Sequence, residues 1–174
     1  MIMKKRIVAL LLALITVLAF ASCGEKSPVT DETTVEDVKD VVTPDIPHFA
    51  TLLEGALSNA SKLTAVEDDY VEAMMEIDLT NVEAYTVRIQ TMGTAIDQYG
   101  IFKAADEKAA KALCEELQSY IDTTRENWEN FNYLPEETPK LDGAKATQKG
   151  VYVFYVIANA NEREAFTKIF NENV

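Results

Sequence analysis

Histidine is nearly missing from this sequence: His48 is the single one among 174 residues. That count excludes metal sites built from several histidines. His48 follows Pro47 at an expected helix start. A local structural or solvent-facing role is a simpler interpretation there than a role as the base of a catalytic triad. The sequence therefore predicts no metal, no other cofactor and no histidine-based catalysis.

Cysteine is almost as scarce, with only Cys23 and Cys114. Cys114 lies between Leu113 and Leu117 on an apolar helical stripe, where we expect a small buried hydrophobic side chain. If Cys23 is acylated, as argued below, no intramolecular disulfide can form even in an oxidising compartment.

Basic residues are outnumbered, 16 against 29 acidic ones, for a net charge of −13. Residues 1–22 contain three of the basic residues and no acidic one, so the remainder has a net charge of −16. Such a chain cannot replace the counterions of a phosphate backbone, and an anionic bilayer does not attract it. We therefore expect no nucleic acid partner and no electrostatic membrane binding.

Long hydrophobic runs are also missing, apart from the 15 uncharged residues 7–21 after the cationic start "MIMKKR". A transmembrane helix needs about 20 apolar residues, whereas a positive start, a short apolar core and a small-residue exit are typical of a secretory signal. Residues 1–22 are therefore predicted to be an export signal.

The exit of this signal, "AFASC", allows two interpretations. "FASC" resembles a bacterial lipobox, in which the Cys23 thiol receives a diacylglyceryl group and Cys23 becomes the first mature residue, open to a further acyl chain such as palmitate. Ala19 and Ala21 also fit the Ala-x-Ala pattern of ordinary cleavage, which would release a secreted protein. We favour lipidation of Cys23, hence a lipid anchor on the extracytoplasmic face of the cell membrane.

The mature chain divides into a tether and one domain. Residues 23–45 lack aromatic residues and are rich in Thr, Asp, Glu and Val, a composition typical of a flexible acidic tether. Residues 46–174 have the size of a single domain that can build its own core.

Hydrophobic spacing in this domain predicts an α+β fold. A first helix is expected from Phe49 to Leu63, a short second one in residues 68–77 with Tyr70, Met74 and Ile77 inward, and then two strand-strand-helix units. The first unit comprises strands at 84–92 and 99–104 and a helix at 107–131 capped by Asp106. The second comprises strands at 144–148 and 151–158, a turn at Lys149-Gly150, and a closing helix capped by Asn161 with Glu164. We expect an antiparallel sheet of about four strands with the helices on one face.

The best candidate binding patch is "NWENFNYLP", in which Trp128, Phe131 and Tyr133 alternate with asparagines. Such aromatic side chains can stack on a sugar or seat a partner, and at this spacing they can equally be the end of a helix packing onto the core. The acidic run at residues 66–78 lacks the ligand spacing and the glycine of a calcium loop, so we interpret it as a solvated helix face.

The order of four blocks, at residues 77–89, 95–106, 131–141 and 149–158, resembles the family called domain of unknown function 4358. The resemblance covers most of the region from Leu52 to Phe170. It implies an envelope location, because members are typically small lipoproteins of Gram-positive anaerobes, and it implies no established activity. Where the family commonly has an acidic pair, this chain has Asp97 followed by Gln98.

Three functions remain open from the sequence. The first is a lipid-anchored envelope module, not an enzyme, that binds or scaffolds an envelope protein or glycan. The second is an extracytoplasmic hydrolase using carboxylates such as Asp97 and Asp106, for which no nucleophile or acid–base pair stands in one motif. The third is a solute-binding accessory protein, which at about 130 residues would be smaller than the usual two-lobed solute trap.

Overall fold

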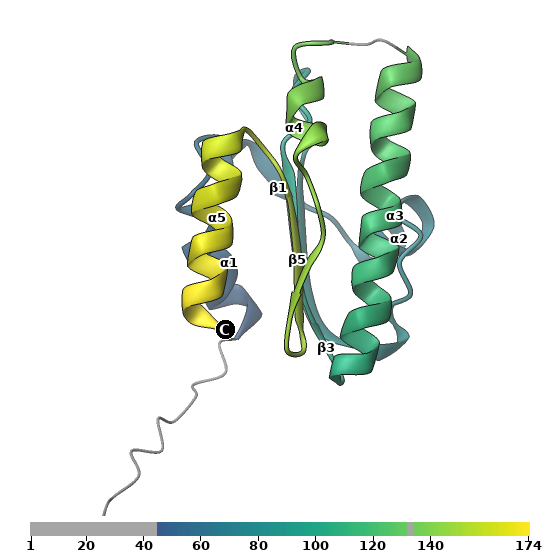
Figure 1. Ribbon diagram of the computed structural model, residues 1–174, viewed down its shortest axis with the longest axis vertical. Helices are drawn as coiled ribbons and strands as arrows, with labels where there is room; N and C mark the ends of the chain where they lie inside the picture. The colour runs from purple at the N-terminus through teal and green to yellow at the C-terminus, as the bar shows by residue number, and fades with distance from the viewer. Residues whose placement is uncertain (1–44, 132–133) are drawn as a thin grey trace, which may run out of the picture. The chain divides into compact units, whose positions relative to one another are not determined.

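The computed structural model describes residues 45–131 and 134–174, whose helices lie against a central sheet (Figure 1). The predicted signal and the tether up to residue 44 lie outside the described residues. Among the described residues, none of the helices has the length and apolar character needed to cross a bilayer. The helices are α1 (Ile46–Glu54), α2 (Asp68–Met74), α3 (Glu107–Phe131), α4 (Thr138–Asp142) and α5 (Ala160–Asn173), with short 3₁₀ turns at Ala60–Lys62 and Leu79–Asn81.

The five strands form one antiparallel sheet, which confirms the predicted α+β class. They are β1 (Leu63–Ala65), β2 (Val82–Gln90), β3 (Gln98–Ala104), β4 (Thr147–Lys149) and β5 (Tyr152–Ile157), in the order β1-β2-β3-β5-β4. The fifth strand is β1, which begins at Leu63, a residue that we assigned to the first helix. That helix ends at Glu54 instead, and a turn containing Gly55 leads the chain to the sheet edge.

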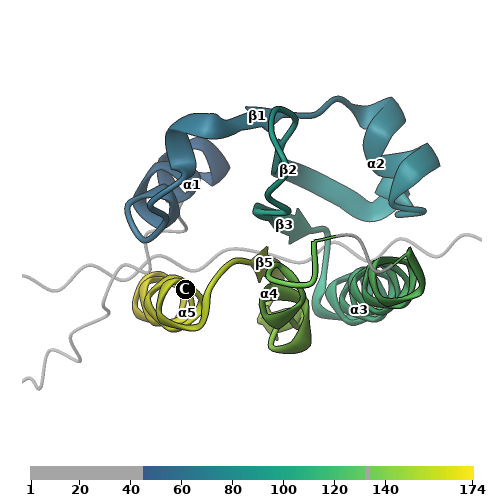
Figure 2. The same ribbon diagram turned by 90° about the horizontal axis from the view of Figure 1, so that it is seen from above.

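The helices cover both faces of the sheet, not one face as we expected (Figure 2). Phe49 of α1 and Phe166 of α5 pack with Tyr99, Ile101 and Phe154 on one face. The other face carries α2, α3 and α4, whose buried residues pack on β2, β3 and β5. The physical reason lies in β5, because all six of its residues are buried. A strand that is apolar on both faces has to be covered on both.

The two strand-strand-helix units therefore place their helices on different faces of the sheet. The helix of the first, α3, and the helix of the second, α5, lie on opposite faces of the sheet. A two-fold axis through the sheet between β3 and β5 would keep both helices on one face, so the units are not related by that symmetry.

The helix ends follow local capping chemistry. Asp106 caps α3 as predicted, because its Oδ1 accepts from the Ala109 N–H at 2.7 Å. The closing helix is capped two residues earlier than predicted: Asn159, not Asn161, accepts from the Glu162 N–H, and Glu162 returns a bond to the Asn159 N–H. β5 ends at Ile157, so the chain has left the sheet by Asn159 and the first capping residue available is used.

The inner face of α2 also differs from the prediction. Val71 and Met75 are the buried residues of this segment, while Met74 is 66% exposed. The helix ends at Met74, and Glu76 adopts a φ of 57° in the turn that follows. Ile77 therefore lies outside the helix, and this turn, not helical spacing, places it in the core.

Candidate functional site

The end of α3 brings two of the three candidate aromatic residues to one surface hollow. Trp128 is partly buried against the core, and its Nε1 donates to the Leu134 carbonyl at 3.4 Å. Phe131 is 80% exposed. Both line a hollow of about 560 Å³ with Thr124 and Asn127, which we call the aromatic hollow. Tyr133, the third residue of the predicted patch, lies outside the described residues.

A second hollow adjoins the first, since Thr124 and Trp128 line both. It lies between α3, α2 and the connection from β2 to β3, with a volume of about 350 Å³, which is within the usual range of ligand sites. We call it the amide hollow, because Gln90 and Gln98 are part of its wall. Its other lining residues are Tyr70, Ile89, Gly93, Thr94, Ala95, Ile96, Asp97, Tyr120, Thr124 and Trp128.

Gln98 is held in one orientation by two tyrosines. Its Oε1 accepts from the Tyr120 hydroxyl at 2.9 Å and from the Tyr155 hydroxyl at 3.1 Å. Burial raises the pKa of Tyr120 to about 12 and holds the pKa of Tyr155 well above its ordinary value, so both hydroxyls stay protonated donors at neutral pH. The carbonyl end of the amide is thus used inside the protein, and the Nε2 end is the one left for other partners.

Gln90 has an unsatisfied acceptor. Its Nε2 donates to the Met92 carbonyl at 3.0 Å, and its Oε1 is buried without a hydrogen-bond partner among the described residues. A buried acceptor without a donor costs about 1–3 kcal/mol of stability.

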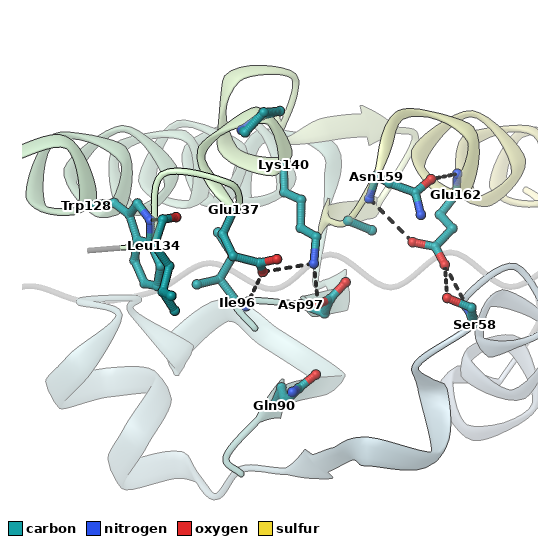
Figure 3. A network of polar contacts seen from close by, with 12 residues as sticks. Ser58, Gln90, Ile96, Asp97, Trp128, Leu134, Glu137, Lys140, Asn159 and Glu162 are labelled. Atoms are coloured by element: carbon teal, nitrogen blue, oxygen red, sulfur yellow. Dashed lines mark hydrogen bonds and ion pairs between the residues drawn. The ribbon is translucent and has the colours of Figure 1, made fainter. Parts of the chain in front are cut away.

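An ion-pair network fixes the connection between β2 and β3 against α4 (Figure 3). Lys140 Nζ lies 2.7 Å from Asp97 Oδ2 and 2.8 Å from Glu137 Oε2, and Glu137 Oε2 also accepts from the Ile96 N–H at 3.0 Å. Burial alone would lower the pKa of Lys140, but the hydrogen bonds to Asp97 and Glu137 outweigh it and raise that pKa. One wall of the amide hollow is therefore pre-positioned by charge.

The two carboxylates considered for hydrolysis do not meet. Asp97 precedes β3 and Asp106 follows it, which separates them by more than about 20 Å along the extended strand. Asp106 is engaged as the cap of α3, and Asp97 as the partner of Lys140. Within residues 45–131 and 134–174, no group of three His, Cys, Asp or Glu side chains could hold a metal ion.

The remaining candidates have local roles in the structure. His48 is exposed, and its backbone N–H donates to the Asp45 carboxylate that caps α1. Cys114 is half-buried, not fully buried as we expected, and it packs against the core around α3.

A comparison with protein-family models finds the domain of unknown function 4358 (DUF4358) over residues 56–158. The chain belongs to this family. No curated protein and no solved structure matches the chain. The DUF4358 match begins after α1 and ends before α5, so it contains the sheet, α3 and all residues that line the two hollows.

Sequence reasoning identified Trp128 and Phe131 in this DUF4358 domain but missed the amide hollow. Gln90 ends a strand and Lys140 stands in a five-residue helix, and neither carries a local signal of function. Gln98 has a weak signal, because it stands beside Asp97 where the family commonly has a second acid. Its two tyrosine partners are 22 and 57 residues away, which no local pattern reveals.

Proposed function

We propose that this DUF4358 protein is a lipid-anchored module of the cell envelope that binds its ligand in the aromatic and amide hollows. The observation that carries the proposal is the joint lining of these hollows. Aromatic side chains, the fixed amide of Gln98 and the side chain of Gln90 line one concave surface. Ligand sites combine apolar walls with a few well-placed polar groups in this way.

The anchor is supported by the sequence of the N-terminal region. A short hydrophobic segment ends at "FASC", and a net charge of −16 after it gives no other means of holding the protein to a membrane. The acyl chains on Cys23 would enter the bilayer, and residues 24–45 would separate the domain from the lipid head groups.

Binding rather than hydrolysis is supported by how the carboxylates are used. Asp97 has 6% of its side chain exposed and is occupied by its ion pair with Lys140. A general acid or base needs free access to the reacting group. Because Ile96 and Asp97 are already held in place, less of the β2–β3 connection has to be ordered when a ligand binds.

Crosslinking on intact cells tests this function. A photoreactive amino acid at Asn127, an exposed residue of the aromatic hollow, should give a discrete crosslinked product. The matched control places the same group at Glu172, which is exposed on α5 on the opposite face of the sheet. A single envelope partner recovered from Asn127 supports the module. Equal products from both positions would contradict it, and a small solute found at Asn127 would favour the solute-binding alternative.

A further inference from the structure

Four neighbouring hollows lie along one side of α3, the one near its start being the smallest at about 60 Å³. The amide hollow shares Tyr120 with a third hollow beside α2, and that hollow shares Glu116 with a fourth near the start of α3. The α3 residues involved include Ala109, Leu113, Glu116, Tyr120, Thr124 and Trp128, at steps of three or four residues that keep them on one side of the helix. We call this feature the α3 groove. From Ala109 to Phe131 it follows about 33 Å of helix.

No Lys, Arg or His lines the α3 groove among the described residues. Acidic residues do: Glu76 and Glu116 line the third hollow, and Asp78 joins Glu116 in the fourth. The described residues place no basic side chain within 4.0 Å of these three carboxylates, although Asp97 further along has Lys140 as its partner. The groove thus has an acidic half and an aromatic half that meet at Tyr120.

The groups that the groove offers to an occupant are mostly acceptors. They include the carboxylates of Glu76, Asp78 and Glu116. Ammonium and guanidinium groups are donors without acceptors, so they fit such a lining better than hydroxyl groups, which need both. Cations are also attracted to tyrosine and tryptophan rings, and Tyr70, Tyr120 and Trp128 line the aromatic half.

We propose that the α3 groove binds an extended, basic segment of a partner polypeptide. This inference rests on the proposed function and names the ligand class of the same site. Two observations favour a polypeptide over a small amine: the length of the groove, which matches about ten extended residues, and its division into acidic and aromatic halves. A net charge of −16 attracts such a segment and repels acidic competitors.

Trp128 provides the readout, because it is the single tryptophan of the chain and lies in the groove. The detergent-solubilised full chain is titrated with a peptide of about ten residues that alternates Arg and Ser. Two further probes are the same peptide with Glu in place of Arg and a neutral N-acetylglucosamine oligosaccharide. We expect the Arg peptide to change Trp128 fluorescence saturably, more weakly at high salt, and the Glu peptide to leave it unchanged.

Two double variants with the same net charge distinguish binding in the α3 groove from non-specific charge attraction. Glu76→Gln with Glu116→Gln removes two groove charges and keeps the side-chain oxygen that accepts from the Asp78 N–H. Glu164→Gln with Glu172→Gln removes two exposed charges on α5, on the other face of the sheet. The groove variant should weaken binding of the Arg peptide about fivefold or more, and the α5 variant should weaken it less than about twofold. Circular dichroism checks that both variants remain folded.

The outcomes distinguish this inference from the proposed function. Equal weakening by both variants would mean general charge attraction and would overturn the basic-peptide assignment. If the oligosaccharide binds saturably and the Arg peptide does not bind, the basic-peptide assignment is also overturned. The proposed binding module then remains, with a glycan as its ligand. If no probe binds and Asn127 crosslinks no more than Glu172, both the inference and the proposed function fail.

Discussion

Lys140 is the residue on which the charge balance beside the amide hollow depends. Its side chain is 17% exposed and lies between Asp97 and Glu137, whose side chains are 6% and 16% exposed. Lys140→Met leaves two poorly solvated carboxylates next to each other, and removing one partner of such a pair costs about 3–5 kcal/mol. Urea denaturation should show that loss in the free energy of unfolding.

The control for Lys140 removes its partner as well. Asp97→Asn combined with Lys140→Met takes away both charges of the closest pair, so the double variant should be more stable than Lys140→Met alone. A double variant that loses the sum of the two single losses would mean that Lys140 and Asp97 act independently.

Cys114 allows a pH prediction at the same scale. Burial raises the pKa of its thiol, with a smaller contribution from the charge of Glu115. Because the thiolate is the reactive form, labelling by a polar disulfide reagent should be slow at neutral pH. The rate should keep rising with pH beyond the ordinary thiol pKa, and Cys114 in urea should react faster at every pH. A native rate equal to the unfolded rate at pH 7 would contradict the burial effect.

At the scale of the element, two nearby asparagines discriminate between the observed and the expected start of α5. Asn159 accepts from the Glu162 N–H, while Asn161 is an exposed residue of the first turn. Asn159→Ala should therefore cost about 1 kcal/mol of unfolding free energy, and Asn161→Ala much less. Thermal denaturation of the two single variants measures the difference. Equal losses would contradict the cap at Asn159.

Glu162 adds a pH dependence to the same element. Burial would raise its pKa, but hydrogen bonds from Ser58 and from the Asn159 N–H outweigh this effect and lower it. A carboxylate with a lowered folded-state pKa stabilises the protein above its unfolded pKa of about 4.3 and loses that contribution as the pH falls. The stability that the Glu162 charge contributes, measured as the difference in unfolding free energy between the wild type and Glu162→Gln, should therefore shrink below about pH 4.

In the sheet, β3 depends on a glycine for close packing. A Cβ at Gly100 would lie 2.5 Å from Tyr155 Cε1 and 2.9 Å from Phe102 Cε2, both in the core under α3. Gly100→Ala should therefore destabilise the domain by about 1–3 kcal/mol through overpacking. Gly150→Asn is the control: its φ is +57°, which asparagine tolerates, and nothing lies within 4 Å of an added Cβ. A neutral Gly100→Ala would show that the core yields at this point.

The sequence predicted elements where one strong local signal exists. The bounds of α3 follow from an unbroken apolar stripe and an aspartate cap, and the hairpins follow from alternation around turn residues. It failed where two local patterns compete. The Asn159 and Asn161 boxes both fit the capping spacing, and Leu63 continues a helical repeat although the helix has already ended. Tertiary packing decides such cases.

At the scale of the whole molecule, the cover of both sheet faces determines where a site can form. α1 and α5 cover one face, and the opposite face leaves the side of α3 beside α2 and the β2–β3 connection partly open. Trp128 and Phe131, at the aromatic end of this groove, are binding candidates from the sequence because they are neighbours on one helix, and their binding role stays a prediction. The amide and acidic parts of the groove come from segments distant in sequence, so composition gave no indication of them.

Cys23 is the residue through which the whole molecule would be held at the membrane, and it lies outside the described residues. Two acyl chains normally suffice for stable anchoring, at about 0.8 kcal/mol per buried methylene, while a net charge of −16 adds no attraction. Cys23→Ser should leave the domain folded and prevent acylation, so the protein stays uncleaved or is cut after Ala21 and enters the medium. The wild type should remain with membranes at high salt and partition into detergent. Wild-type protein recovered from the medium with Ser22 as its first residue would show that Ala19 and Ala21 direct ordinary cleavage and that no lipid anchor forms.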